Sequence, residues 1–228
     1  MKIAIVGFGK MGRVVRDLAR SQGHEVTAEL DVGQLSPGSL RGPDVAIEFT
    51  QPDAAPGNLI QLAEWRVPTV CGTTGWYGRL PEVRKAVEAA RTGLVFAPNF
   101  SLGVQLLYRA ARELGRGLKE RPEFDAYLVE THHQGKTDAP SGTAAGLRDS
   151  LRAVDPDRDY PITSIRAGKV PGTHELRIEG SGESLVLQHT AHDRSIFAAG
   201  ALAAARWLVD GKRRGVFTLE QALFGEGQ

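Results

Sequence analysis

The first hundred residues alternate short apolar runs with segments whose apolar positions recur at helical spacing. Continuous apolar runs are typical of strands buried on both faces. The alternation of such strands with helices predicts an α/β fold with a parallel sheet. The five predicted strands are Lys2–Val6, Glu25–Leu30, Val45–Phe49, Pro68–Cys71 and Leu94–Ala97. The predicted helices between them are Arg13–Ser21, Asp53–Trp65 and Pro81–Arg91.

After Asn99 the pattern changes. Strand-like segments now follow one another with little helix between them, which predicts a second, α+β domain with a mixed or antiparallel sheet. Its predicted helices are Leu102–Lys119 and Ser141–Ala153, the second with Ser141 as N-cap, and its predicted strands are Phe124–Thr131, Ile162–Ala167, His174–Glu179 and Ser184–His189. An alanine-rich helix at Ser195–Val209 and a short element at Gly215–Phe224 are expected to return to the first domain.

A glycine-rich turn joins the first predicted strand to the first predicted helix. Gly7, Gly9 and Gly12 have the spacing GxGxxG. The first glycine permits a tight turn, the second lets the backbone approach a pyrophosphate, and the third lets the helix pack on the strand. This context predicts a Rossmann-type dinucleotide-binding domain, to which we assign residues 1–100 and 195–228. Residues 101–194 are then an inserted substrate-binding domain.

The predicted cofactor site consists of the loops that follow the strands, where open α/β sheets bind ligands. Asp31 would accept hydrogen bonds from the ribose hydroxyls, which favours NAD. Lys10 and Arg13, near the phosphate turn, could instead neutralise a 2′-phosphate. Because a carboxylate bonded to the ribose is geometrically fixed, we predict that NADH is preferred and NADPH is tolerated. The predicted cofactor-binding residues are Gly7, Phe8, Gly9, Lys10, Met11, Gly12, Asp31, Gly72, Thr73, Thr74, Ala97, Pro98, Asn99 and Phe100.

Composition narrows the class of protein. The net charge is +1, so neither nucleic acid nor a membrane surface is an expected partner. No apolar run approaches the roughly 18 residues of a transmembrane helix, and the N-terminus enters a strand without a signal-peptide pattern. The single cysteine, Cys71, excludes an internal disulfide and a cysteine-based zinc cluster. We therefore predict a cytoplasmic protein.

The densest chemistry lies in residues 130–144, which read ETHHQGKTDAPSGTA. His132 and His133 precede Lys136, and a turn leads to Ser141 at a predicted helix start. A titratable acid, a fixed cation and free backbone N–H groups are what a site needs to bind a small dianion and give it a proton. The alternative is a polar turn between a strand and a helix. The histidines do not have a usual zinc spacing, so no metal is predicted.

Five elements together resemble the 4-hydroxy-tetrahydrodipicolinate reductase (dihydrodipicolinate reductase) family over essentially the whole chain. They are the glycine turn, GTTG at Gly72–Gly75, APNFSLG at Ala97–Gly103, the stretch 130–144, and the segment containing Arg194. One element departs from the family. The family's usual turn is GxxGxMG, whereas this chain has GFGKMG, which is one residue shorter. The phosphate contacts and the cofactor preference of this chain could therefore differ from those of the family.

The resemblance implies hydride transfer from NAD(P)H to a small cyclic dicarboxylate with an imine-type ring, followed by a proton, in lysine (diaminopimelate) biosynthesis. It implies His132 as proton donor and Lys136 as its catalytic partner. It also implies a homotetramer associated through the sheet of the inserted domain. The implied substrate-binding residues are His133, Ser141, Gly142, Thr143 and Arg194.

Two other functions remain open at this point. Another two-domain NAD-dependent dehydrogenase of the amino-acid type would share the glycine turn but would not need the DAPSGTA segment. A non-catalytic NAD-binding sensor would need a face for DNA or a protein partner, and no basic helix provides one. His174, His189 and His192 have no spacing that assigns them a role.

Overall fold

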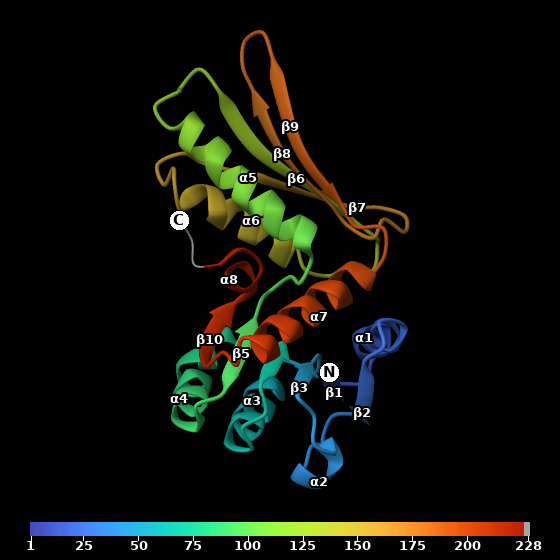
Figure 1. Cartoon of the computed structure of the whole chain (residues 1–228). Coiled ribbons are helices and arrows are strands. Elements are labelled where there is room, and N and C mark those ends of the chain that lie inside the picture. The colour runs from blue at the N-terminus through green and yellow to red at the C-terminus, as the bar shows by residue number, and fades with distance from the viewer. Residues whose placement is uncertain (226–228) are drawn as a thin grey trace. The chain divides into compact units, whose positions relative to one another are not determined.

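The structure, a computed structural model, describes residues 1–225. The chain divides into two compact units. Residues 1–101 and the chain from Arg194 onward form the first unit, and Leu102–Asp193 form the second. Each unit has its own sheet and its own helices (Figure 1). None of the helices in residues 1–225 is long and apolar enough to cross a membrane.

The first unit contains a six-stranded sheet in which every strand pairing is parallel. One strand more is present than the sequence predicts, because the predicted final element is a strand, β10, followed by a short helix, α8 (Leu219–Phe224). Thr218 and Gln221 form a capping box that begins α8 and so ends the strand. In sheet order the strands are β10 (Gly215–Thr218), β5 (Gly93–Phe96), β4 (Thr69–Cys71), β3 (Val45–Glu48), β1 (Lys2–Val6) and β2 (Glu25–Leu30).

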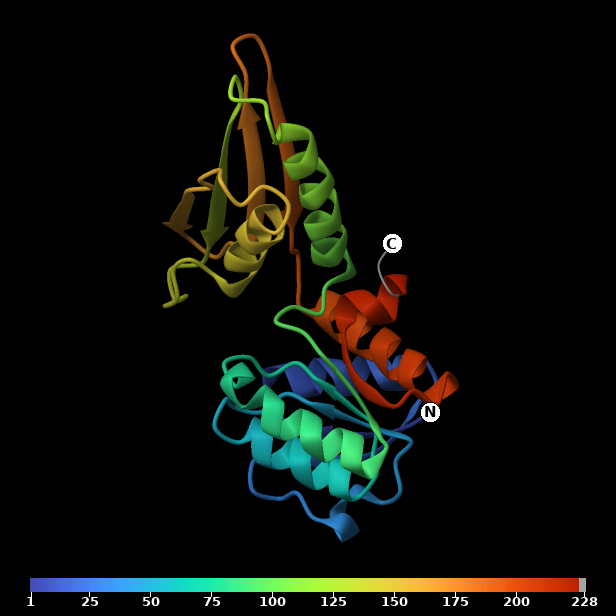
Figure 2. The same cartoon turned by 90° about the vertical axis from the view of Figure 1, so that its left-hand side faces the viewer.

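Helices cover both faces of this sheet (Figure 2). α1 (Lys10–Ser21) and α7 (Ser195–Asp210) pack on one face, and α3 (Ala55–Glu64) and α4 (Leu80–Ala90) pack on the other. This two-sided burial explains the continuous apolar runs read from the sequence. Two short helices were not predicted, α2 (Pro37–Leu40) and η1 (Tyr77–Arg79), because they are too short for an apolar period to show.

The second unit contains a four-stranded mixed sheet covered on one face by two helices (Figures 1 and 2). The sheet order is β7 (Ile162–Arg166), β6 (Asp125–His132), β8 (Thr173–Glu179) and β9 (Ser184–Thr190). Only the β6–β7 pairing is parallel. α5 (Leu102–Leu118) and α6 (Gly142–Arg152) bury the inward side chains of β6 and β8. The predicted combination of a parallel sheet and a mixed sheet is confirmed.

Candidate active site

The glycine turn after β1 leaves room for a ligand at one of its three glycines. Gly7 has φ +97°, and a Cβ there would lie 2.1 Å from the Phe49 carbonyl oxygen. A Cβ at Gly12 would lie 2.2 Å from the carbonyl oxygen of Gly7. A Cβ at Gly9 would meet nothing within 4 Å. The first and third glycines are therefore required by packing, whereas the second faces open space, as a backbone that approaches a pyrophosphate must.

A pocket of about 400 Å³ lies beside this turn. No side chain caps the α1 N-terminus and no acidic residue lies in its first turn, so the helix dipole is available to an anion. Phe49, Thr50 and Pro52 line the pocket but were not predicted, although they follow β3 at the ligand-binding edge of the sheet. The predicted residues that line the pocket are Gly9, Lys10, Met11, Gly72, Thr73 and Thr74.

The other predicted cofactor residues do not line this pocket. Ala97 and Phe100 are buried in the core of the first unit, and the Asn99 side chain accepts a hydrogen bond from the Ser101 N–H at 2.8 Å. Pro98 is exposed in the same loop. Asp31 is exposed directly after β2, so its carboxylate is accessible. These residues remain predicted contacts of the nicotinamide and ribose ends of a dinucleotide.

The Phe8 ring lies close to two arginines of α1. The guanidinium carbon of Arg13 is 4.7 Å from the ring centroid, and that of Arg16 is 5.1 Å away. Arg16 also forms an ion pair with Asp17 at 2.8 Å, whereas Arg13 is exposed. A cation near the phosphate turn and a carboxylate after β2 are thus both present in the first unit.

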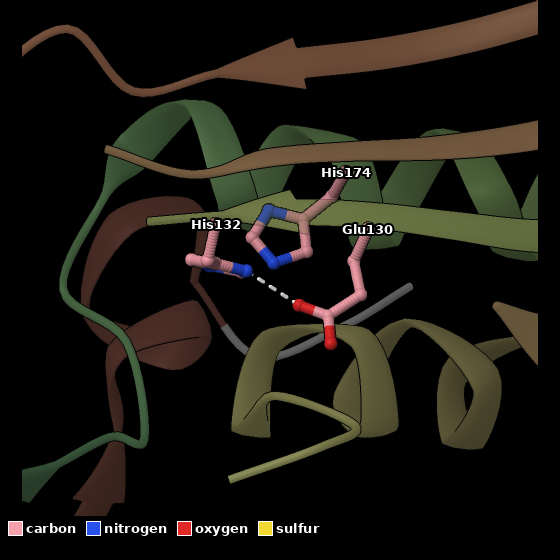
Figure 3. Close-up of side chains that lie close together, drawn as sticks. All are labelled: Glu130, His132 and His174. Carbon is pink, nitrogen blue, oxygen red and sulfur yellow. Dashed lines mark ion pairs between the residues drawn. The ribbon is translucent and has the colours of Figure 1, made fainter. Parts of the chain in front are cut away.

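The paired histidines of the sequence lie at the end of β6 in the second unit. Strand side chains alternate, so Glu130 and His132 occupy the same, inward face of the sheet. The Nδ1 atom of His132 is 2.5 Å from the Oε2 atom of Glu130. His174 projects from the neighbouring β8 toward both (Figure 3), and its ring centroid is 5.0 Å from that of His132. A carboxylate and two imidazoles therefore meet in a buried cluster.

Glu130 is anchored through its other oxygen, Oε1. That atom accepts hydrogen bonds from Ser164 Oγ at 2.6 Å, from Arg166 Nη2 at 2.7 Å and from the Ser141 N–H at 3.1 Å. Burial by itself would raise the pKa of this carboxyl, but the bonds from Arg166, Ser164 and Ser141 outweigh it and lower the pKa to about 2. Glu130 is therefore ionised although it is only 1% exposed.

Both imidazoles in the cluster favour the neutral form. Burial lowers the pKa of His132, and the positive charges of Lys136 and Arg166 lower it further, against the opposing effect of Glu130. Burial, and then the proximity of His132, lower the pKa of His174 to about 4. The Nε2 atom of His174 lies 3.1 Å from Ser141 Oγ. An anionic ligand would oppose these effects and favour protonation of His132.

Glu130, His132 and His174 offer ligand atoms that lie within 4.8 Å of one another, a grouping that could hold a metal ion. The sequence did not reveal it, because His174 comes from a different strand. The contact of 2.5 Å between Nδ1 and Oε2 is shorter than the roughly 3.3 Å that separates two ligands of one tetrahedral zinc. Arg166 also occupies the second oxygen of Glu130. Glu130 is thus already paired with His132 and hydrogen-bonded to Arg166, and we assign no metal to the cluster.

Lys136 lies in the turn after β6, where its Nζ atom is 2.6 and 2.8 Å from the two carboxylate oxygens of Asp138. Burial would raise the pKa of Asp138, but Lys136 outweighs it and lowers that pKa. Arg166 Nη2 donates to the Asp138 carbonyl oxygen at 2.6 Å. Asp138 therefore fixes both the turn and the lysine.

The start of α6 is built as the sequence predicts. The Ser141 side chain accepts a hydrogen bond from the Ala144 N–H at 3.2 Å, so Ser141 is the N-cap. Gly142 is exposed, and the Thr143 carbonyl oxygen accepts a bond from the Tyr108 hydroxyl at 3.1 Å. This helix start shares the second unit with the histidines and Lys136.

Two further predicted substrate residues are not members of the buried cluster. His133 is half-buried, and its carbonyl oxygen accepts the Lys136 N–H at 3.1 Å in the turn after β6. Arg194 belongs to the first unit, where it is the exposed N-cap residue of α7. Its predicted role as a carboxylate clamp therefore remains a prediction.

The neutral state of His174 gives the protein a pH-dependent stability. The folded pKa is about 4 against 6.5 for the free side chain, so the unfolded chain binds this proton first as the pH falls. The free energy of unfolding should therefore decline between pH 6.5 and 4, by at most about 3.5 kcal/mol from this residue, because each pKa unit is worth roughly 1.4 kcal/mol. His174→Gln should flatten this decline in denaturant titrations. An unchanged slope in the variant would contradict the assignment.

Comparison with known families bears directly on this site. The family model described as "Dihydrodipicolinate reductase, N-terminus" matches residues 1–100, and the one described as "Dihydrodipicolinate reductase, C-terminus" matches residues 103–223. The chain belongs to the dihydrodipicolinate reductase family. Membership makes it an oxidoreductase, as the resemblance implied, and a pyridine-nucleotide cofactor follows from the family.

Individual relatives agree over the full length. The chain is 35% identical to the 4-hydroxy-tetrahydrodipicolinate reductase of Methanoregula boonei, with 97% of each chain covered. It is 32% identical to the reductase of the same name from Christiangramia forsetii, with 98% of each covered. The solved structure of dipicolinate-bound dihydrodipicolinate reductase from Paenisporosarcina sp. TG-14 shares the fold, with a TM-score of 0.82 at 24% identity, over 98% of this chain and 99% of that one.

Proposed function

We propose that this enzyme reduces 4-hydroxy-tetrahydrodipicolinate to tetrahydrodipicolinate with NAD(P)H, a step of lysine biosynthesis through diaminopimelate. The names of the full-length relatives support this substrate. The observation that carries the proposal is the buried Glu130–His132 pair, close to Lys136 and in the same unit as the start of α6. Such a site supplies a proton and positive charge to a small anion.

The chemistry divides between the units. The bound dinucleotide supplies a hydride, and the residues fitted to hold it surround the pocket beside the glycine turn. His132 donates a proton to the substrate, whose hydroxyl is lost as water in the overall reaction. Lys136 stabilises charge that develops on the ring. The carboxylates bind to His133, to Ser141, Gly142 and Thr143 at the start of α6, and to Arg194.

The decisive experiment follows NADH consumption with freshly made 4-hydroxy-tetrahydrodipicolinate. A reductase consumes NADH only when this substrate is present. An amino-acid dehydrogenase would instead reduce NAD with an amino acid, and a sensor would bind NADH without turnover. Either of the last two results would overturn the proposal.

Assembly and location belong to the same proposal. A homotetramer formed through the sheet of the second unit is supported by the face that α5 and α6 leave uncovered. On that face Ile165 is 43% exposed and Val186 is 47% exposed, so apolar side chains are available there to a second copy. The expected partners are a small cyclic dicarboxylate and further copies of this chain. A cytoplasmic location stays a prediction.

Cofactor preference can be tested at Asp31. We expect NADH to be preferred and NADPH to be tolerated, because the accessible carboxylate after β2 would bond to the ribose while Arg13 and Lys10 offer only mobile charges. Asp31→Ser should shift the ratio of kcat/KM values toward NADPH by about 10-fold or more, since a hydrogen bond to a charged group is worth roughly 1.5–3 kcal/mol. The shift should come mainly from a higher KM for NADH.

The matched control for this variant is Glu25→Ser, which removes an exposed carboxylate from the opposite end of the same strand. It should leave the ratio unchanged. If the wild-type enzyme prefers NADPH 10-fold or more, Asp31 does not bind the ribose, and the shortened glycine turn becomes the first feature to examine.

A further inference from the structure

The two oxygens of Glu130 make different contacts. Oε1 is held by Ser164 and Arg166 of β7 and by the Ser141 backbone at the start of α6, which are two separate segments. Oε2 lies 2.5 Å from the Nδ1 atom of His132. The carboxylate is therefore fixed from one side and points at the imidazole from the other.

This arrangement determines which nitrogen of His132 can face a ligand. Nδ1 is completely buried against Glu130, so Nε2 is the nitrogen left for a substrate. The backbone beside Nε2 is that of Gly172, where a Cβ would lie only 2.9 Å from Nε2. The absence of a side chain at Gly172 keeps that nitrogen uncovered. A carboxylate oxygen 2.5 Å from Nδ1 also selects the tautomer, since its charge favours a proton on that nitrogen.

We propose that Glu130 is a positioning residue for the proton transfer, holding the Nδ1–H of His132 so that Nε2 presents the transferred proton. The inference rests on the proposed function. In the step, His132 starts as the imidazolium, protonated on both nitrogens with the substrate bound. The Nε2–H bond breaks as a C–H bond forms from the electron pair of a C=C bond in the hydride-reduced ring, and the electron pair of the broken N–H bond stays on Nε2. The Nδ1–H is kept, Glu130 remains ionised, and solvent restores the proton to Nε2 after product leaves.

The competing explanation is that Glu130 only joins strands, as one partner of a buried ion pair with Arg166. The second unit contains a pair of that kind which touches no histidine. The Asp155 carboxylate is 2.9 Å from Arg158 Nε and 3.1 Å from the Tyr160 hydroxyl, and Asp155 is 5% exposed. Asp155→Asn is therefore the matched control for the loss of a buried carboxylate bonded to an arginine.

The test is a double-mutant cycle with Glu130→Gln, His132→Gln and the double variant, assayed with NADH and 4-hydroxy-tetrahydrodipicolinate. Glu130→Gln should lower kcat by roughly 10- to 1,000-fold, with KM for NADH unchanged. The double variant should be no slower than His132→Gln alone, because Glu130 acts through His132. Asp155→Asn should lower the melting temperature yet keep kcat.

Two results would overturn the inference. The first is a double variant in which Glu130→Gln lowers kcat by the same factor as it does in the wild-type enzyme. The second is a loss of kcat in Asp155→Asn as large as the loss in Glu130→Gln. A wild-type enzyme that does not reduce the substrate would instead refute the proposed function. If Glu130→Gln does not fold, nitrogen NMR of the wild-type imidazoles decides the question. The neutral His132 ring should carry its proton on Nδ1, and a ring protonated on Nε2 alone would contradict the role of Glu130.

Discussion

His132→Gln is expected to lower kcat by roughly 10²–10⁴-fold, the contribution of a positioned general acid, while the fold and NADH binding persist. Glutamine can still donate a hydrogen bond to Glu130, so the buried carboxylate keeps a partner. It cannot release a proton near neutral pH. Steady-state kinetics with saturating NADH would measure the effect.

The same variant should alter the pH profile. Burial lowers the pKa of His132 in the free enzyme, so kcat/KM should fall as the pH rises through that lowered value and the acid form is lost. This limb should be absent in His132→Gln and present in His24→Gln, which changes a histidine of the first unit. Near-normal kcat in His132→Gln would remove this residue from the mechanism.

Local signals were enough to predict most of the fold. The predicted strands fall on β1 and β2 residue for residue. β1 is a continuous apolar run buried on both faces, which leaves little choice of boundary. Ser141 was recognised as an N-cap from its residue type and position, and its side chain does cap α6. The strand β10 was missed since four residues with an exposed end carry too little periodicity to separate them from α8.

The candidate site was harder to predict, because its network forms between strands. In the register of the second sheet, Glu130 lies opposite Ser164 on β7 and opposite His174 on β8, and His132 lies opposite Arg166. No sequence spacing gives these pairings. One signal was available: residues two apart on a strand share a face, which places Glu130 beside His132.

A second buried carboxylate escaped the sequence analysis for a similar reason. Glu48 ends the apolar run of β3 and is fully buried. It accepts hydrogen bonds from the Thr50 N–H at 3.2 Å and from the Cys71 thiol at 3.1 Å. Thr50 lines the pocket beside the glycine turn, so Glu48 orders part of that wall. A buried carboxylate at the end of an apolar run is tolerated when neighbouring segments donate hydrogen bonds to it. Because Cys71 is distant from Glu48 in the sequence, the sequence alone does not reveal this donor.

Lys136→Ala should reduce both turnover and substrate affinity, with kcat lower by roughly 10²–10³-fold and a higher KM for the dicarboxylate. The lysine is held by both oxygens of Asp138 at 2.6 and 2.8 Å and is close enough to His132 to lower its pKa. Its charge is therefore fixed beside the proposed proton donor before substrate arrives. If the lysine charge stabilises the bound anion and the transition state equally, its loss raises KM. If it stabilises charge that develops only in the transition state, its loss lowers kcat.

Two further variants separate these contributions of Lys136. Lys136→Arg keeps the positive charge but changes its geometry and cannot donate a proton near neutral pH, so it should restore substrate KM more than kcat. Lys169→Ala, which removes an exposed lysine between β7 and β8, should change neither constant. Were Lys136→Ala to alter only the affinity for NADH, the lysine would belong to the cofactor site. Asp138 would then hold in place a lysine that binds a phosphate of the cofactor. Two N–H groups of this lysine donate to the Asp138 carboxylate, and the third can donate to one further anion.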